Sequence, residues 1–98
     1  MSLSIVIPTY GRDEVLTDTI AQLLAQSPPA AEILVVDQTT DHAAPTTDQL
    51  QAWHRAGAIR WIRHQPPGTV GAMNRGLVEA TGDVALFLDD DIRPGEGL

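Results

Sequence analysis

The sequence predicts an α/β domain with a Rossmann-like parallel sheet and the element order β-α-β-α-β-α-β. Two observations lead to this prediction, the alternation of two kinds of segment and the length of the chain. Four short apolar runs alternate with three segments whose apolar residues recur at helical spacing. Alternation of short buried strands with helices of about ten residues implies right-handed crossovers and parallel strands. The 98 residues suffice for one small domain and not for two, so residues 1–98 are expected to form a single domain.

The first strand is expected at residues 3–8, LSIVIP, where Pro8 ends the strand by removing an amide donor. The next segment predicts a helix that begins near Asp13 and Glu14, whose charges complement its positive end. Its apolar face comprises Val15, Leu16, Ile20, Leu23 and Leu24. The prolines at positions 28–29 stop this helix.

The middle of the chain predicts a strand, a helix and a second strand. Residues 32–36 form the expected strand, and Asp37 follows it directly. The helix is expected from about residue 46 to residue 56, with Gly57 as its C-terminal stop. Residues 59–63 alternate apolar with charged side chains, which suits a partly exposed edge strand.

The last helix is predicted by four apolar residues at helical spacing, Val70, Met73, Leu77 and Val78. Residues 84–88 are then apolar on both faces, which is typical of a central strand. Three carboxylates follow at once, Asp89, Asp90 and Asp91. Ligands bind at this end of strands in open α/β sheets, and a hard cation such as Mg²⁺ or Mn²⁺ would relieve the repulsion among the carboxylates. A solvated acidic turn is the alternative.

Composition excludes several classes of function. The net charge of −7 argues against binding nucleic acid or an anionic membrane through a basic face. The chain has no lysine, which excludes a lysine nucleophile or a P-loop, and no cysteine, which excludes a thiolate metal site. The apolar run at residues 5–7 is too short to span a bilayer, and a cytoplasmic location is the default expectation. No Gly-x-Gly-x-x-Gly turn follows the first strand, so a dinucleotide site is not expected.

A nucleoside diphosphate is a ligand that could bind at the acidic ends of both strands. It can donate hydrogen bonds to Asp37 and bring phosphate to a cation at Asp91. Asp37 could instead cap its own turn through Thr39 or Thr40. Tyr10 could stack on a base or pack in the core. No spacing joins the three histidines, so each is expected alone on a loop or helix surface without a metal or acid-base role: His42, His54 and His64.

Four segments in order, residues 4–10, 35–37, 68–77 and 87–91, resemble the family 2 glycosyltransferases of the GT-A fold. The resemblance implies the N-terminal, nucleotide-sugar-binding half of such an enzyme, with a UDP- or GDP-type donor and Mn²⁺ or Mg²⁺. The resulting candidates for nucleotide binding are Pro8, Thr9, Tyr10, Arg12, Asp37, Gly68, Asn74, Asp89 and Asp90. The metal ligands that it implies, the Asp-x-Asp motif, are Asp89 and Asp91. Met73, Gly11 and Gln38 depart from the family pattern.

The resemblance also implies inverting transfer to an unknown acceptor, with the catalytic base beyond Leu98. The chain alone is therefore expected to transfer no sugar. Its fourth strand would have one bare edge, through which we expect self-association. A non-catalytic nucleotide-binding or assembly module is the first alternative, and a Mg²⁺-dependent phosphate-handling α/β domain is the second. The missing lysine counts against the second alternative.

Overall fold

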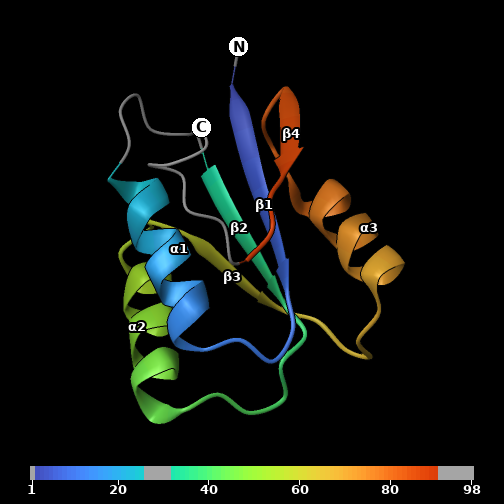
Figure 1. Cartoon of the computed structure of the whole chain (residues 1–98). Helices are drawn as coiled ribbons and strands as arrows, with labels where there is room; N and C mark the ends of the chain where they lie inside the picture. The colour runs from blue at the N-terminus through green and yellow to red at the C-terminus, as the bar shows by residue number, and fades with distance from the viewer. Residues whose placement is uncertain (1, 26–31, 91–98) are drawn as a thin grey trace.

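The computed structural model describes residues 2–25 and 32–90, with α1 and α2 on one face of the sheet and α3 on the other (Figure 1). The elements are β1 Leu3–Thr9, α1 Glu14–Leu24, β2 Glu32–Asp37, α2 Ala44–Arg55, β3 Arg60–Arg63, α3 Thr69–Glu79 and β4 Val84–Phe87. The predicted order is thus confirmed. No helix within the described part of the chain has the length and apolar character needed to cross a membrane.

Four parallel strands form one sheet in the order β3-β2-β1-β4. β1 is a central strand, in which Ile5 lies opposite Ile33 of β2 and Leu86 of β4. β3 lies at one edge, as its alternating sequence predicts. Because all four strands run in the same direction, their carboxyl ends meet at one edge of the sheet, which we call the carboxyl edge.

The apolar core has two halves, one on each face of the sheet. Ile5 and Ile7 of β1 pack with Leu16 of α1 and Leu50 of α2. Val6 points to the other face and belongs to the half that α3 covers. Successive side chains of a strand point to opposite faces, so the unbroken apolar run of β1 supplies both halves at once.

Pro8 does not end β1, contrary to the prediction, because the strand continues through Thr9 opposite Asp37. The pairing of β1 with β4 ends at Val6, whose carbonyl accepts from the amide of Leu88. Val6 and Pro8 are two residues apart in the strand, so their backbone groups point to the same side, toward β4. At the level of Pro8, however, the pairing between β1 and β4 has already ended. The missing N–H of Pro8 therefore removes no ladder hydrogen bond.

The predicted apolar face of α3 is wrong. Val70 is 73% exposed and Val78 is 81% exposed, whereas the buried residues of α3 are Ala72 and Gly76. A Cβ added at Gly76 would lie 2.4 Å from Cγ1 of Val6. The helix approaches the sheet so closely that only small residues fit between them, and the larger apolar side chains consequently face solvent.

β4 has the apolar sequence of a central strand but the bare edge that was expected for it in this chain. Within the described residues it pairs with β1 alone and forms an edge of the sheet. Val84 and Leu86 are 43% and 44% exposed. Phe87 packs against the core half beneath α3, and Leu88 packs against the half beneath α1. In the sheet formed by residues 2–25 and 32–90, β4 therefore carries an apolar sequence without a second strand beside it.

Candidate functional site

A cavity of about 400 Å³ opens at the carboxyl edge, between the ends of β1 and β4 and the start of α3. We call it the carboxyl-edge cavity. It contains six of the predicted nucleotide-binding residues, Pro8, Thr9, Tyr10, Arg12, Asp89 and Asp90. The rest of its lining is Gln38, Thr69, Met73, Phe87 and Leu88. Parallel strands place these segments together, although the two groups of candidates are about eighty residues apart in sequence.

Asp90 is held in place by residues of the first βα unit. Thr9 Oγ1 donates a hydrogen bond of 2.7 Å to Asp90 Oδ2, and Arg12 Nε lies 3.6 Å from Asp90 Oδ1. The hydroxyl of Thr19 in α1 donates to the backbone carbonyl of Asp90 at 2.9 Å. Together these contacts fix the turn after β4 against β1 and α1.

Asp89 is exposed in the lining of the same cavity. Asp91, the other predicted metal ligand, lies outside the described residues. Within residues 2–25 and 32–90 no group of three or more His, Asp or Glu side chains is placed to hold a metal ion. The donor chemistry nevertheless suits a divalent cation, because carboxylate oxygens are the ligands that Mg²⁺ and Mn²⁺ prefer. The Asp89–Asp91 metal site stays a prediction.

Asp37 ends β2 at the same edge, but its side chain is fully buried and is not part of the cavity lining. Its Oδ1 accepts from the amide of Thr39 at 3.0 Å, which is the turn-capping bond that the sequence offered as an alternative. Its Oδ2 accepts from Trp61 Nε1 at 2.8 Å and lies 2.5 Å from His42 Nε2. Protein donors thus surround this carboxylate on three sides.

His42 is not on the surface as expected, because only 1% of its side chain is exposed. Its Nδ1 lies 2.9 Å from Asp13 Oδ1, so the imidazole bridges two carboxylates. Burial lowers the pKa of His42, but the hydrogen bonds and charges of Asp37 and Asp13 outweigh it and raise this pKa. The bond to His42 in turn lowers the pKa of Asp13. No local sequence pattern indicates this bridge, because Asp13 and His42 are 29 residues apart.

Gln38 is a second residue whose role the sequence did not indicate. It is buried, and its Oε1 accepts from the amide of Gly68 at 2.6 Å, while its Nε2 donates to the carbonyl of Thr9 at 3.3 Å. Gln38 therefore ties the end of β1 to the start of α3. Of the remaining predicted residues, Gly68 lies at the N-terminus of α3, and Asn74 is exposed on α3 outside the cavity lining.

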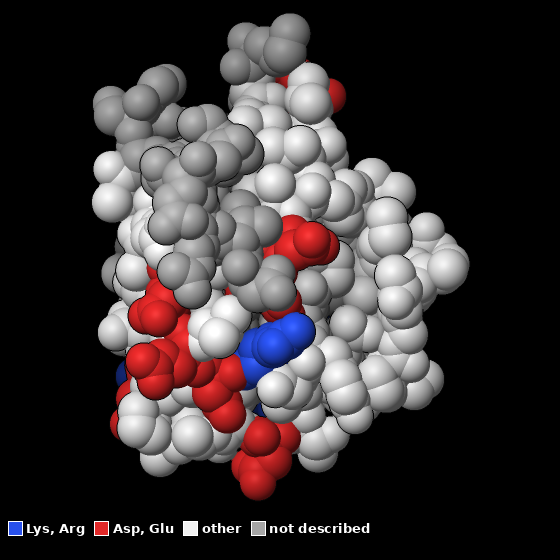
Figure 2. All heavy atoms as spheres, viewed as in Figure 1, with Lys and Arg blue, Asp and Glu red and all other residues white. Residues whose placement is uncertain are grey.

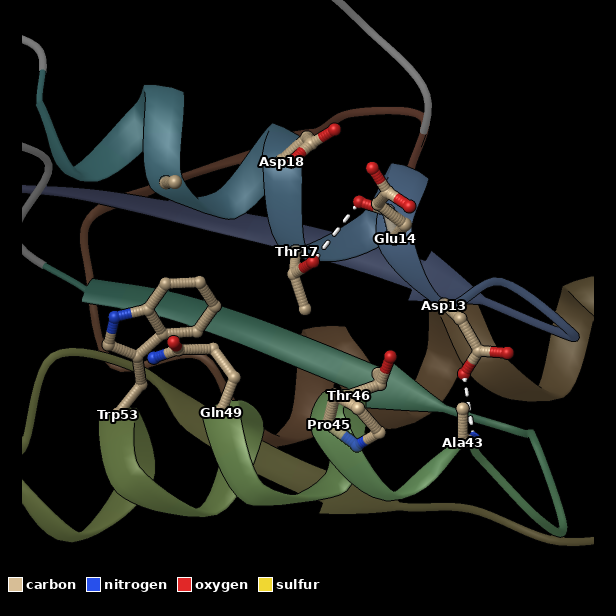
Figure 3. A pocket seen from close by; sticks show the side chains of 10 residues that line it. Asp13, Glu14, Thr17, Asp18, Ala43, Pro45, Thr46, Gln49 and Trp53 are labelled. Atoms are coloured by element: carbon tan, nitrogen blue, oxygen red, sulfur yellow. Dashed lines mark hydrogen bonds between the residues drawn. The ribbon is translucent and has the colours of Figure 1, made fainter.

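A second cavity, of about 510 Å³, lies between α1 and α2 (Figure 3). We call it the helix-pair cavity. Asp13 lies at one end, where its Oδ1 accepts from the amide of Ala43, and Trp53 lies at the other. Glu14 and Asp18 add further carboxylates to its lining. Figure 2 shows that acidic side chains predominate over basic ones on the face formed by α1, which agrees with the acidic composition.

A family model described as glycosyl transferase family 2 matches residues 4–97. An uncharacterized glycosyltransferase of a Nostoc species is 36% identical over 92 residues, which are 93% of this chain and 28% of that protein. A GalNAc(5)-diNAcBac-PP-undecaprenol beta-1,3-glucosyltransferase of Campylobacter jejuni is 32% identical over 92 residues, 91% of this chain and 29% of that protein. The chain therefore spans less than a third of the length of these relatives.

Comparison with solved structures also finds similarity over most of this chain. Residues 1–349 of TarS from S. aureus, crystallised in complex with UDP-GlcNAc, superpose with a TM-score of 0.72 and 26% sequence identity. The match covers 93% of this chain and 27% of that one. Another crystal structure of TarS residues 1–349 superposes with a TM-score of 0.75 and 26% sequence identity. The α/β architecture expected from the sequence is confirmed by this likeness.

Proposed function

Since the chain belongs to glycosyl transferase family 2 and has the expected GT-A type of fold, we propose that it is the donor-binding half of a glycosyltransferase that uses a nucleoside-diphosphate sugar. One observation carries this proposal. The carboxyl-edge cavity joins the segment after β1 to the acidic turn after β4, through the hydrogen bond between Thr9 and Asp90. A cavity at this edge is where α/β sheets bind nucleotides.

The donor is proposed to be of the UDP or GDP type. Support for UDP comes from TarS, which was crystallised with UDP-GlcNAc. Tyr10 is 62% exposed in the cavity lining, so its ring is available to stack on a base. Arg12 lies in the same lining and would attract a phosphate. Asp37 is proposed to accept a hydrogen bond from the base.

Asp89 and Asp91 are proposed to hold Mn²⁺ or Mg²⁺. When bound, the cation would stabilise the leaving diphosphate as a Lewis acid. Asp90 lies between them in sequence, and Thr9 and Arg12 hold its carboxylate in the cavity wall. This contact supports the proposal because it leaves the exposed neighbour Asp89 to bind the cation.

The proposed reaction is an inverting displacement at the anomeric carbon of the sugar. An acceptor hydroxyl loses its proton to a carboxylate base and forms the new bond, while the nucleoside diphosphate leaves with the electron pair of the old one. We propose that the base and the acceptor site lie outside residues 1–98. The chain alone should then bind the donor weakly and transfer no sugar. A cytoplasmic location also stays a prediction.

Calorimetry tests this function directly. We expect UDP or GDP to bind the wild-type chain, with higher affinity when Mn²⁺ is present, and Asp89→Asn to remove that metal dependence. Asp48→Asn is the matched control, because Asp48 is an exposed carboxylate on α2 outside both cavities. Absence of binding to both nucleotides, with and without Mn²⁺, would contradict the proposal. Sugar transfer by this chain alone would contradict the placement of the base.

Self-association through the bare edge of β4 is a further proposal. In the described sheet β4 pairs with β1 only, and an unpaired strand edge recruits another strand. The exposed apolar side chains on β4 and α3 extend this surface, and they include Val70, Leu77, Val78, Val84 and Leu86. A second copy of the chain would cover it. A strictly monomeric chain in sedimentation at high concentration would contradict this proposal.

A further inference from the structure

His42 lies at the centre of a buried polar cluster at the carboxyl end of β2. Its Nε2 faces Asp37 Oδ2 at 2.5 Å, and its Nδ1 faces Asp13 Oδ1 at 2.9 Å. Asp37 is fully buried, whereas 46% of the Asp13 side chain is exposed. The imidazole thus joins the carboxyl end of β2 to the segment before α1.

The two contacts require both ring nitrogens to carry a proton. A neutral imidazole has one N–H donor and one acceptor nitrogen, and an acceptor facing a carboxylate oxygen would be repelled. The imidazolium donates at both positions. Its charge is compensated by Asp37 and Asp13, which is the condition for a buried cation. The raised pKa of His42 agrees with this geometry.

The cluster leaves Asp37 one acceptor position. Each carboxylate oxygen can accept about two hydrogen bonds. Oδ2 receives them from Trp61 Nε1 and His42 Nε2, whereas Oδ1 receives one from the amide of Thr39. The second position on Oδ1 has no donor among the described residues, so it is the position proposed for a ligand donor, although the side chain itself is fully buried. Its direction is set by the two groups that hold Oδ2.

We propose that His42 is a positioning residue for the donor nucleotide: its two N–H groups fix the Asp37 carboxylate to the segment before α1 and orient Oδ1 toward the base. This rests on the proposed nucleotide binding by Asp37. His42 itself touches no substrate in this scheme. Loss of its second proton turns one hydrogen bond into a repulsive contact, so the orientation of Asp37 and the nucleotide affinity depend on pH.

The charged groups around His42 define the pH response. Asp37 and Asp13 are the two carboxylates that contact the ring. Further polar groups on the packed elements include Glu14 and Asp18 of α1, Thr46 of α2, and Trp61 and Arg63 of β3. Arg63 donates to the carbonyls of Thr39 and Thr40, in the loop that carries His42. As pH rises through its raised pKa, His42 is therefore expected to lose one of the two ring protons that bond it to the carboxylates.

The test compares His42→Gln and His42→Ala with the wild-type chain. Binding of UDP with Mn²⁺ is measured by calorimetry between about pH 6 and about pH 8.5, which spans the titration of a histidine with a raised pKa. We expect either variant to bind about tenfold more weakly at the acid end, with the difference from wild type shrinking as pH rises. His64→Gln is the control, because His64 is outside the cluster and the cavity lining.

NMR provides a readout that does not depend on the ligand. The His42 ring should titrate above the ordinary histidine pKa of 6.5, and the Trp61 indole N–H resonance should follow the same titration, because both groups bond to Asp37 Oδ2. UDP binding that is equal in His42→Gln and wild type at every pH would overturn the positioning role alone. No UDP binding by the wild-type chain would overturn the proposed function and this role together. A His42 ring that titrates at or below the ordinary histidine pKa of 6.5 would overturn the cluster itself.

Discussion

The hydroxyl of Thr9 donates a 2.7 Å hydrogen bond to Asp90, which lies 81 residues further along the chain. Thr9 is the last residue of the central strand β1, and Asp90 belongs to the acidic turn after the edge strand β4. Because the strands are parallel, this contact forms at the carboxyl edge, where the proposed donor binds. The bond therefore holds the acidic turn of the candidate site against the central strand of the sheet.

Thr9→Val should weaken both stability and nucleotide binding. Valine keeps the shape of the side chain but removes the donor, so the part-buried carboxylate of Asp90 loses one partner. We expect the free energy of unfolding to fall by about 1 to 2 kcal/mol in urea titrations. Thr40→Val is the control, because Thr40 is exposed in a neighbouring loop. Equal stability of the two variants would contradict a structural role for the Thr9–Asp90 bond.

Gly76→Ala should destabilise the chain, because the added methyl group would lie 2.4 Å from Cγ1 of Val6. The core must shift to admit it, and such overpacking typically costs about 1 to 3 kcal/mol. Gly71→Ala is the matched control in the same helix, since its methyl group meets only the His64 ring, at 3.3 Å. Urea unfolding measures both variants. If Gly76→Ala is as stable as Gly71→Ala, the close approach of α3 to the sheet is incorrect.

Leu86→Lys should reduce self-association. Leu86 is 44% exposed on the edge strand β4, where a lysine charge would oppose pairing with a second chain. Val15→Lys is the matched control, because Val15 is 43% exposed on α1, away from that edge. Sedimentation velocity over a range of concentrations measures the association. An equal effect of both substitutions would contradict association through this specific edge.

Stability should fall as pH rises through the pKa of His42. This pKa is raised above its ordinary value of 6.5 in the folded chain, so the folded state binds the proton more tightly than the unfolded state. The stabilisation is therefore complete below about pH 6.5 and is lost as pH rises through the folded value. Urea unfolding of wild type and His42→Gln at a series of pH values measures it. If the difference in unfolding free energy between the two proteins grows with rising pH, the expected direction of the pH dependence is wrong.

Local sequence patterns were sufficient to predict the order of the strands and helices. They also predicted that residues from β1 and from the turn after β4 meet in the candidate site. The runs around Ile5 and Val35 are apolar enough to predict buried parallel strands, and the carboxyl ends of such strands must meet at one edge. That rule alone brings Thr9 and Asp90 to the same cavity. Helical spacing likewise predicts the burial of Leu16, Ile20 and Leu23 in α1, although Val15, which was placed on the same face, is 43% exposed.

The side chains that α3 buries were decided by the distance between this helix and the sheet. Helical spacing in α3 marks Val70 and Val78 as one apolar stripe, yet the gap beside Val6 admits only Gly76 and Ala72. No local pattern contains that gap, because it is set by how closely α3 packs on β1.

Amino-acid order along the chain therefore determined which segments become strands and helices, and at which edge the acidic residues gather, because periodicity and strand direction are local properties. Only the folded structure decided that Asp37 is buried and that His42 joins it to Asp13, because hydrogen bonds between residues 29 positions apart depend on how the elements pack. The same packing turned the large apolar side chains of α3 to solvent, because the sheet left room only for the small ones.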